Sequence, residues 1–285
     1  MLFVQIIKDR RSNKNFVMTN MKNQKMILKS RKLNNSKNKS RIMQDDIFKD
    51  GKYVLSYGGG INSTALIIHI VKNKLPLDYV IFSDTGDEMP ETYEYVEYMA
   101  KYLKRHKIPF EIVKPRSTLS EVCIRRKVVP SQIWRWCTRD HKVRPIHKFY
   151  KKLGSNINQY MGIDYDEVTR MKPSGKDWIT NIYPLIDDKI GREGCIAIIK
   201  QARLKIPVKS GCYFCPFNNK DRWQEIYENH PELYQKAREI EENNKHMPRQ
   251  KLTRITLASM AERFENKQEI PMIEEGSPCG SECMI

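Results

Sequence analysis

The sequence contains no apolar run near the roughly 20 residues that a membrane-spanning helix needs, so we exclude a membrane-embedded protein. We also expect no signal peptide, because the apolar stretch at residues 2–7 is too short for a signal core and its charges follow it rather than precede it. Without a secretion signal, the seven cysteines argue against a disulfide scaffold. They indicate reduced thiols kept for metal or sulfur chemistry, and we expect a cytoplasmic location.

Positive charge is abundant but unevenly distributed. The 285 residues include 51 Lys or Arg and 34 Asp or Glu, a formal net charge of +17. Residues 1–50 hold 13 of the basic and 4 of the acidic side chains, which is just over half of the excess. This Lys- and Asn-rich stretch has no clear period, and we expect a disordered extension. An arm that contacts nucleic acid phosphates is a second interpretation, and a compact protein that starts at Met43 is a third.

Strand and helix patterns alternate from residue 51 onward. The predicted elements are strands at 53–57, 78–83 and 110–113, and helices at 65–71, from Pro90 and within 221–243. This alternation predicts a Rossmann-like α/β fold, with a mostly parallel sheet, flanking helices and ligands at the carboxyl ends of the strands. We expect a nucleotide-binding domain at residues 51–205 and a small helical, cysteine-containing region at residues 206–285.

Three consecutive glycines, Gly58, Gly59 and Gly60, join the first strand to an apolar helix. Glycines let the backbone approach an oligophosphate closely, and the amides at the helix start can donate to it together with the Ser63 and Thr64 hydroxyls. No Gly-Lys-Ser/Thr follows, so this is not a Walker loop. A tight turn between strand and helix needs fewer glycines, and the pattern therefore favours phosphate binding.

Several motifs in fixed order give the sequence a specific resemblance to a known family. The motifs are Ser56–Thr64, Phe82–Thr92, Trp136–Ile146, Gly162–Arg170, Tyr183–Leu185 and Lys209–Phe217. Together they resemble the phosphoadenylyl-sulfate (PAPS) reductase family of the PP-loop ATP pyrophosphatase superfamily, also described as adenine nucleotide alpha-hydrolase-like. Enzymes of this superfamily split ATP between the α and β phosphates. The resemblance covers about residues 51–235.

The resemblance implies a site for ATP or another adenylyl nucleotide, with Mg²⁺. The residues expected to bind the nucleotide are Ser56, Gly58, Gly59, Gly60, Asn62, Ser63, Thr64, Asp84, Thr85 and Gly86. Asp84 and Thr85 would lie near the ribose or Mg²⁺, and an ordinary turn cap is the alternative for Asp84. The family loop usually carries Asp where this chain has Asn62, which removes one negative charge.

Cations are dense in the third motif and just before it. By the resemblance this neighbourhood faces the anionic end of the nucleotide or of a sulfur substrate, and we predict Arg139 and Lys142 as catalytic residues. Trp134 and Trp136 lie among these cations and could stack a nucleic acid base. A solvated basic face with two buried tryptophans is the structural alternative.

Cys212 and Cys215 form a Cys-x2-Cys pair whose thiolates can reach one metal centre, and no second such pair is present for a zinc ribbon. Related reductases hold a [4Fe–4S] cluster with a Cys-Cys pair in the central motif and a distal Cys-x2-Cys. Here Trp136 takes one place of the first pair and Cys137 keeps the other. The resemblance therefore implies three ligands for a cluster, with Zn²⁺ as the alternative metal.

The fourth ligand has no motif position. We predict Cys195, which precedes the Cys-x2-Cys pair at short range, with Cys123, Cys279 and Cys283 as alternatives. A buried hydrophobic role is the alternative for Cys123 or Cys195. Cys283 also follows a glutamate near the last residue, as the nucleophilic cysteine of the reductases does, and we predict it as a catalytic nucleophile. An idle thiol on a loose tail is the other interpretation.

These features predict a PP-loop enzyme that performs adenylyl-dependent or reductive sulfur transfer. Its partners would be an adenine nucleotide and a sulfur donor or thiol reductant, and the basic charge would suit tRNA or DNA as the acceptor. Two alternatives stay open. One is PAPS or adenylyl-sulfate reduction itself, with Cys283 as the nucleophile. The other is a non-catalytic nucleic acid-binding protein that uses the N-terminal extension and the Arg- and Trp-containing region.

Overall fold

Five short strands form one sheet in the computed structural model, which describes residues 51–154, 156–247 and 250–270. The strands are β1 (Lys52–Tyr57), β2 (Tyr79–Ser83), β3 (Phe110–Val113), β4 (Ile157–Tyr160) and β5 (Ile179–Ile182). Their order is β3-β2-β1-β4-β5, and every neighbouring pair is parallel. In this register Leu55 of β1 lies between Val80 of β2 and Tyr160 of β4. The predicted α/β fold with a parallel sheet is confirmed.

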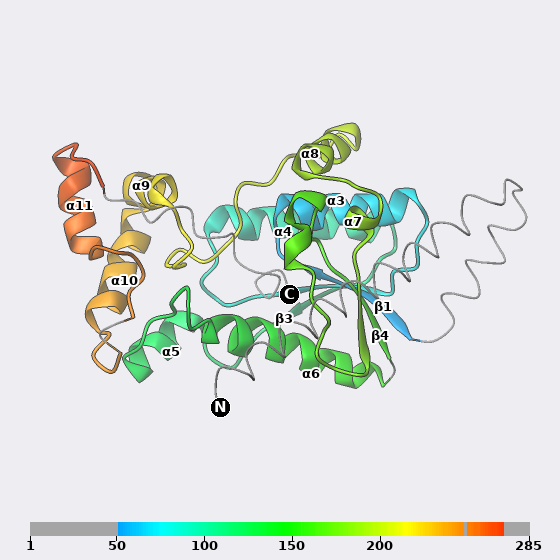
Figure 1. Ribbon diagram of the computed structural model, residues 1–285, viewed down its shortest axis with the longest axis horizontal. Helices are drawn as coiled ribbons and strands as arrows, with labels where there is room; N and C mark the ends of the chain where they lie inside the picture. The colour runs from blue at the N-terminus through cyan, green and yellow to red at the C-terminus, as the bar shows by residue number, and fades with distance from the viewer. Residues whose placement is uncertain (1–50, 155, 248–249, 271–285) are drawn as a thin grey trace, which may run out of the picture. The chain divides into compact units, whose positions relative to one another are not determined.

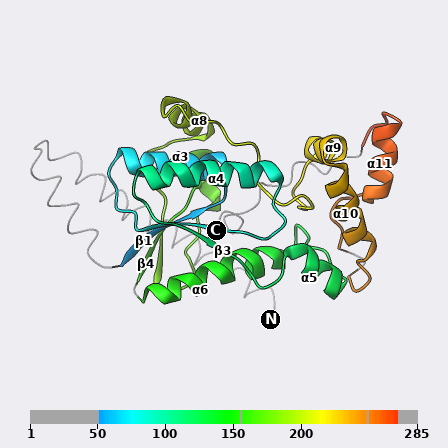
Figure 2. The same ribbon diagram turned by 180° about the vertical axis from the view of Figure 1, so that it is seen from behind.

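Helices cover both faces of the sheet. The helices of the sheet domain are α3 (Ile61–Lys72), α4 (Pro90–Arg105), α6 (Arg144–Leu153), α7 (Pro184–Asp187) and α8 (Arg192–Gln201). Helices α3 and α4 lie on one face and α6 on the other (Figures 1 and 2). Helix α3 is itself covered by α8, which packs along it. Because it is buried from two sides, α3 is apolar almost all round, from Ala65 to Ile70.

A second hydrophobic core lies beside the sheet domain, where four helices meet. These are α5 (Leu119–Arg126), α9 (Lys220–Asn229), α10 (Pro231–Glu242) and α11 (Leu257–Glu265). Their shared core contains Trp136 and Trp223, both buried, and the partly buried Cys137 and Cys212 pack against it. The thiols of the two cysteine motifs therefore border this second core. The division of the chain at residue 205 stays a prediction.

The chain reverses direction across the sheet between β1 and β4. It runs outward from β1 to β2 and β3, and then returns to the other side of β1 to add β4 and β5. In open parallel sheets this switch point leaves a crevice at the carboxyl ends of the two central strands. The glycine loop follows β1, and Gly162 follows β4, so both lie at this point.

Within the residues that the structure describes, no helix has the length and apolar character needed to cross a membrane.

The first prediction concerns Gly162, which lies against the backbone of Ser63. A Cβ at position 162 would stand 2.9 Å from the Cα of Ser63 and 3.0 Å from its amide nitrogen, and rigid backbone cannot make room cheaply. We expect Gly162→Ala to lower the free energy of unfolding by about 1–3 kcal/mol, as overpacking does. Chemical denaturation measures the change.

The matched control is Gly58→Ala. A Cβ there would meet no atom within 4 Å, so stability should stay unchanged or rise by up to about 1 kcal/mol. Equal stability of the two variants would contradict the close approach of β4's end to the loop.

Candidate functional site

The three glycines of the loop after β1 are there for different reasons. Gly59 has a φ of +75°, and a Cβ on it would lie 3.2 Å from Cγ2 of Thr92. A Cβ on Gly60 would lie 3.2 Å from Oγ of Ser210. Gly58 has neither constraint, because its φ is outside the left-handed region and no atom lies within 4 Å of its Cβ position. The fold itself does not require glycine at position 58, and open space remains beside it.

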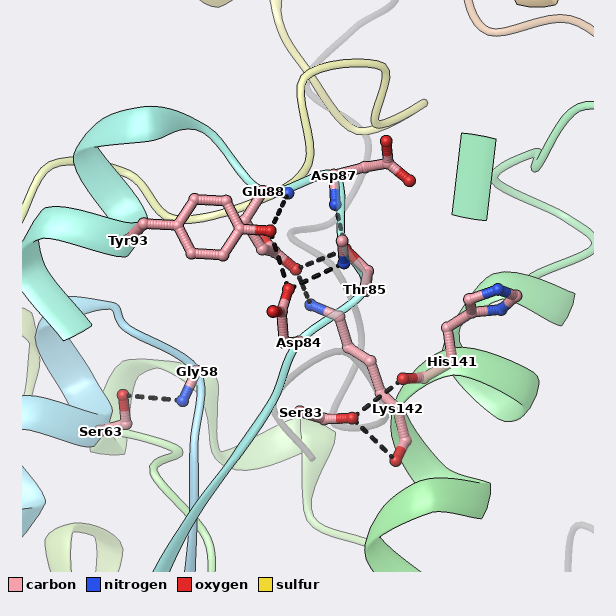
Figure 3. Close-up of polar contacts among 11 residues, drawn as sticks. Gly58, Ser63, Ser83, Asp84, Thr85, Asp87, Glu88, Tyr93, His141 and Lys142 are labelled. Carbon is pink, nitrogen blue, oxygen red and sulfur yellow. Dashed lines mark hydrogen bonds and ion pairs between the residues drawn. The ribbon is translucent and has the colours of Figure 1, made fainter. Parts of the chain in front are cut away.

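The first turn of α3 contains backbone amides that have no partner within the helix. The first intrahelical hydrogen bond runs from the Thr64 amide to the Gly60 carbonyl (3.1 Å), which leaves the preceding amides of the first turn without helical partners. Gly60 is the N-cap and supplies no capping side chain. The Ser63 hydroxyl bonds within the loop, accepting from the Gly58 amide at 3.4 Å (Figure 3). Such a helix start attracts anions, and here it opens at the switch point of the sheet.

Two of the hydroxyls predicted to bind nucleotide instead face the interior. Ser56 is fully buried and lies 3.1 Å from the hydroxyl of Tyr150. Thr64 is fully buried too, and its hydroxyl lies 3.3 Å from that of Tyr57. Contact of these two side chains with a phosphate stays a prediction, and in the structure each hydroxyl has a buried tyrosine partner. Their role here is to hold β1 and α3 in place.

Asn62 connects the loop to two later segments. Its Nδ2 donates to Oε2 of Glu167 (3.3 Å) in η2, a 3₁₀ segment at Tyr165–Arg170. Its Oδ1 accepts from the Arg192 guanidinium (2.9 Å) at the start of α8. An aspartate could not donate to Glu167 and would face it with a second negative charge. The amide at this position thus follows from its neighbours, which the loop sequence alone does not reveal.

The turn after β2 is organised around Asp84. Its carboxylate accepts from the Gly86 amide (2.8 Å) and the Tyr93 hydroxyl (2.8 Å), and it pairs with Lys114 (2.9 Å). Figure 3 shows the bond from Tyr93. Burial by itself would raise the pKa of Asp84, but the ammonium of Lys114 and the two hydrogen bonds outweigh it and lower the pKa below its ordinary value. Asp84 therefore carries its charge already balanced within the turn.

Gly86 is required by the local fold. Its φ is +82°, and a Cβ on it would lie 2.5 Å from Cγ2 of Thr118. Thr118 is the N-cap of α5 and forms a capping box with Glu121, so α5 begins directly against this turn. The structure gives Asp84 and Gly86 structural roles, and direct contact with a nucleotide stays a prediction for them and for Thr85.

Lys142 extends from the central motif to the end of β2. It lies in a π-helical segment, η1 (Thr138–Val143), a rare conformation that is frequent at functional sites. The Ser83 hydroxyl donates to the carbonyls of His141 (2.9 Å) and Lys142 (3.4 Å), which fixes the segment against β2 (Figure 3). The Lys142 ammonium then lies 3.3 Å from Oε1 of Glu88, which is almost fully buried. Glu88 is held in turn by the Thr85 hydroxyl at 3.1 Å.

The charge of Lys142 is retained despite its burial. Burial favours the neutral amine, but Glu88 and the neighbouring thiols favour the ammonium form, and the pKa of Lys142 is raised above its ordinary value. A permanent cation therefore stands between a buried carboxylate and a group of thiols. This arrangement stabilises negative charge that develops on those thiols or on a bound anion.

Three cysteines meet beside Lys142. Cys212 and Cys215 share a hydrogen bond, which lowers the pKa of the Cys215 thiol to about 7, whereas the pKa of Cys212 is raised well above its ordinary value. Burial raises the pKa of the Cys137 thiol, and the neighbouring Cys215 raises it further. Glu88 pairs with Cys212 in an isolated β-bridge, so the Cys-x2-Cys segment is attached to the end of β2. The structure thus brings the two cysteine motifs together.

Cys195 is not part of this group. It is fully buried on α8, and burial raises the pKa of its thiol to about 12. The charged groups that act on it most are Asp164 and Arg192, on the side of α3 and α8. Helix α8 packs against α3, and Cys195 is not among the residues of the second core, so the structure does not bring it together with the other three thiols, and its role as a ligand stays a prediction.

The other predicted residues are separated or lie outside the described residues. Arg139 is exposed and pairs with Asp140 (2.8 Å), which also binds Arg144, so the structure does not direct its side chain to the thiols. Cys283 lies outside the described residues. Across residues 51–154, 156–247 and 250–270, no three His, Cys, Asp or Glu side chains are arranged to hold one metal ion.

Three residues contribute to the site without a role predicted from the sequence. Glu88 was inside a motif but carried no role, and Ser210 and Gly162 were recognised only as motif members. Ser210 packs on Gly60, and Cys212 follows two residues later, so one segment links the glycine loop to the thiols. The glycines were a usable signal, since a glycine outside a predicted turn often marks a close backbone approach.

Comparisons with known proteins agree with this arrangement at the level of the family. Residues 52–172 match the family described as phosphoadenosine phosphosulfate reductase domain. No curated protein sequence matches the chain.

Three solved structures are similar to the chain at low identity. A PAPS reductase from Candida auris in a phosphate complex is 17% identical, covers 59% of this chain and 80% of its own, and has a TM-score of 0.43. A U34-tRNA thiolase, NcsA, from Methanococcus maripaludis with its [4Fe–4S] cluster is 17% identical, with coverages of 70% and 75% and a TM-score of 0.46. An NH₃-dependent NAD synthetase from Campylobacter jejuni is 12% identical, with coverages of 81% and 92% and a TM-score of 0.39. Similarities this low assign no reaction or ligand to this chain.

The second prediction concerns the thiol pair. The hydrogen bond from Cys212 is the largest cause of the lowered pKa of Cys215, so Cys212→Ala should raise that pKa above about 7. In metal-free protein, the pH at which iodoacetamide alkylates Cys215 at half its maximal rate should move upward. Mass spectrometry of the peptide that carries Cys215 measures this, with Cys195→Ala as the control. An unchanged profile in Cys212→Ala would show that the two thiols do not interact.

Proposed function

We propose that this chain, whose residues 52–172 match the phosphoadenosine phosphosulfate reductase domain, binds ATP or an adenylyl nucleotide and uses it for sulfur chemistry at the adjacent thiols. In the form we favour, the reaction is adenylyl-dependent sulfur transfer. Reduction of an adenylyl sulfate is the second candidate, favoured by the family match itself.

The open space beside Gly58 is the observation that carries the nucleotide-binding part of the proposal. A glycine that neither packing nor a left-handed φ requires is explained by a ligand that approaches the backbone there. The amides at the start of α3, which follow Gly58 within five residues, have no capping side chain, and an oligophosphate would satisfy them. We propose that the phosphates bind to the backbone of Gly58, Gly59 and Gly60 and to the amides of Asn62 and Ser63, with Mg²⁺ bound to the nucleotide.

The three thiols beside Lys142 are close enough to the phosphate site to act on the same substrate. Ser210 packs on Gly60, and Cys212 pairs with Glu88 at the end of β2, so the segment between them spans from the phosphate site to the thiols. Lys142 pairs with Glu88 and lies near enough to Cys212 and Cys215 to interact with their charge. We assign Lys142 the role of stabilising negative charge on the leaving phosphate or on the attacking sulfur.

The donors at this place fit an iron–sulfur cluster. Three soft thiol ligands converge at a largely buried position, and the ammonium of Lys142 balances their negative charge. Cysteines bound to a cluster reach different iron atoms and stand further apart than the donors of one ion. We propose Cys137, Cys212 and Cys215 as the cluster ligands. A bound cluster would supply sites for a sulfur atom or for electrons.

In the favoured reaction, an acceptor oxygen attacks the α-phosphorus of ATP and pyrophosphate leaves, which gives an adenylated acceptor. A hydrosulfide ion from the sulfur donor then attacks the acceptor carbon, a C–S bond forms, and AMP leaves with the electrons of the broken C–O bond. The loop backbone holds the leaving pyrophosphate, and Lys142 stabilises the negative charge on the leaving phosphate or on the attacking sulfur. In the reductive candidate, a thiolate, with Cys283 as the predicted nucleophile, attacks the sulfur of an adenylyl sulfate and adenylate leaves. A second thiol then releases sulfite as a disulfide forms.

The third prediction tests the nucleotide site without knowledge of the acceptor. Gly58→Val fills the open space, and we expect affinity for ATP, measured by calorimetry, to fall about tenfold or more. We expect the melting temperature to stay close to that of the wild type, because a Cβ at position 58 meets no protein atom within 4 Å. Ala197→Val adds similar volume on the exposed side of α8 and should leave affinity unchanged. Wild-type affinity in Gly58→Val would refute phosphate binding at this loop.

The wild-type protein is also used to distinguish adenylyl-dependent sulfur transfer from reduction of an adenylyl sulfate. Incubation with thioredoxin and either sulfonucleotide should release no sulfite if adenylyl-dependent transfer is correct. Sulfite release that is lost in Cys283→Ser would instead establish the reductive candidate.

The fourth prediction concerns the cluster. Anaerobic purification should give a brown protein that contains iron and acid-labile sulfide, and Cys137→Ser, Cys212→Ser and Cys215→Ser should each lose most of both. Cys195→Ser is the matched control, because that buried thiol lies with a different group, and it should keep the cluster. A colourless protein that contains stoichiometric zinc would refute the cluster and indicate a structural metal site instead.

A further inference from the structure

The loop before Cys137 presents two apolar side chains to solvent. Ile133 is 98% exposed and Trp134 is 42% exposed. Both lie in a tight turn in which the Trp134 amide donates to the Ser131 hydroxyl at 2.9 Å. Trp136, two residues further on, is only 4% exposed, and its indole nitrogen donates to the Val129 carbonyl. The two tryptophans thus have different roles, since one anchors the loop and the other is left at the surface.

This turn is fixed next to the Cys-x2-Cys segment. The side-chain amide of Gln132 donates through Nε2 to the Pro216 carbonyl (2.8 Å). The Arg135 guanidinium lies over the Phe217 ring, 5.2 Å from its centroid. Pro216 directly follows Cys215. The turn that carries Ile133 and Trp134 is therefore attached to the segment that directly follows Cys215. Because its anchors hold the turn in place, a partner would bind it without a large ordering cost.

The chain on both sides of the turn is strongly cationic in sequence. From Ile124 to Lys148 the chain has eight Lys or Arg and one acidic residue, Asp140. Asp140 is occupied by Arg139 and Arg144. Arg126 and Lys127, which precede the turn at the end of α5, are exposed and have no ion pair among the described residues. An apolar tip within a cationic surface suits a polyanion that carries aromatic groups.

We propose that this surface, formed by Ile133, Trp134, Arg126 and Lys127, binds a single-stranded segment of nucleic acid as the sulfur acceptor. One base stacks on Trp134 and packs against Ile133, and the phosphates on either side pair with the two cations. An indole at the tip of a turn can stack only on a base that is unpaired. A protein partner would need a larger apolar centre than these two side chains provide. The identification as acceptor rests on the sulfur transfer proposed above, but the binding itself does not.

The experiment is fluorescence anisotropy with the full chain, without nucleotide, and labelled oligonucleotides of about 12 residues, near the upper end of the range that such surfaces cover. An RNA and a DNA version are compared with a chain of equal length that carries abasic residues. Wild-type protein should bind the base-containing probes roughly tenfold more tightly than the abasic one, as stacking of one base implies. Trp134→Ala should bind all of them alike, and Trp134→Phe should keep most of the difference.

Charge is tested separately with a matched pair of variants. Arg126→Gln with Lys127→Gln should reduce the slope of log affinity against log salt by about 1.4, the value for two lost phosphate contacts on a single strand. Lys101→Gln with Lys104→Gln removes two exposed cations from α4 and should leave the slope unchanged.

Three outcomes would overturn the proposal. They are equal binding of abasic and base-containing probes by the wild type, unchanged discrimination in Trp134→Ala, and Trp134-dependent binding of thioredoxin in place of the oligonucleotides. Each leaves the nucleotide measurements untouched. Conversely, a protein that does not bind ATP but still shows Trp134-dependent stacking would refute the proposed function and leave the proposed nucleic acid-binding surface supported.

Discussion

The loop between β1 and α3 is held by backbone that approaches it closely, and the rest of the site depends on this contact. Gly162 packs on the backbone of Ser63 from the side of β4, and Ser210 packs on Gly60 from the side of β2 and α4. Neither approach tolerates a Cβ without movement. Together they fix the start of α3 at the switch point of the sheet and bring the segment that carries Cys212 to the edge of the loop. The one part of the loop left open is the space beside Gly58.

Around this contact, charge is arranged in balanced pairs. Asp84 is satisfied by Lys114 and by the turn that it caps, and Glu88 is satisfied by Lys142. The second pair has a further consequence, because it holds a cation against three thiols in a buried place. Breaking one partner of a buried pair leaves an uncompensated charge, so Glu88 and Lys142 constrain each other's position. The chemistry that we propose uses the side of Lys142 that Glu88 does not occupy.

Much of the fold was accessible from the sequence. The buried strand, glycine turn and apolar helix at residues 53–71 predicted the central unit, since residues with local periodicity report their own secondary structure. The order of the motifs also indicated the family. The sequence could not show which way a side chain turns at a given position. Ser56 and Thr64 were expected at the phosphate, yet each faces a tyrosine, and only the packing of α3 on the sheet decides this.

The cysteines show the same division between local and long-range information. Their spacing singled out Cys212 and Cys215, because a Cys-x2-Cys is read within one short segment. The meeting of these two with Cys137 across about 75 positions, and the separation of Cys195 from them, required the tertiary structure. Proximity along the chain suggested Cys195, but α8 packs on α3 and carries that thiol to another part of the molecule. The sequence by itself therefore determined the parallel sheet and the resemblance of residues 52–172 to a known domain, and it indicated a candidate chemistry, because local patterns encode all three. The tertiary structure decided which glycine is free for a ligand, which thiols share a site and which tryptophan reaches solvent, because contacts between distant segments set each of these.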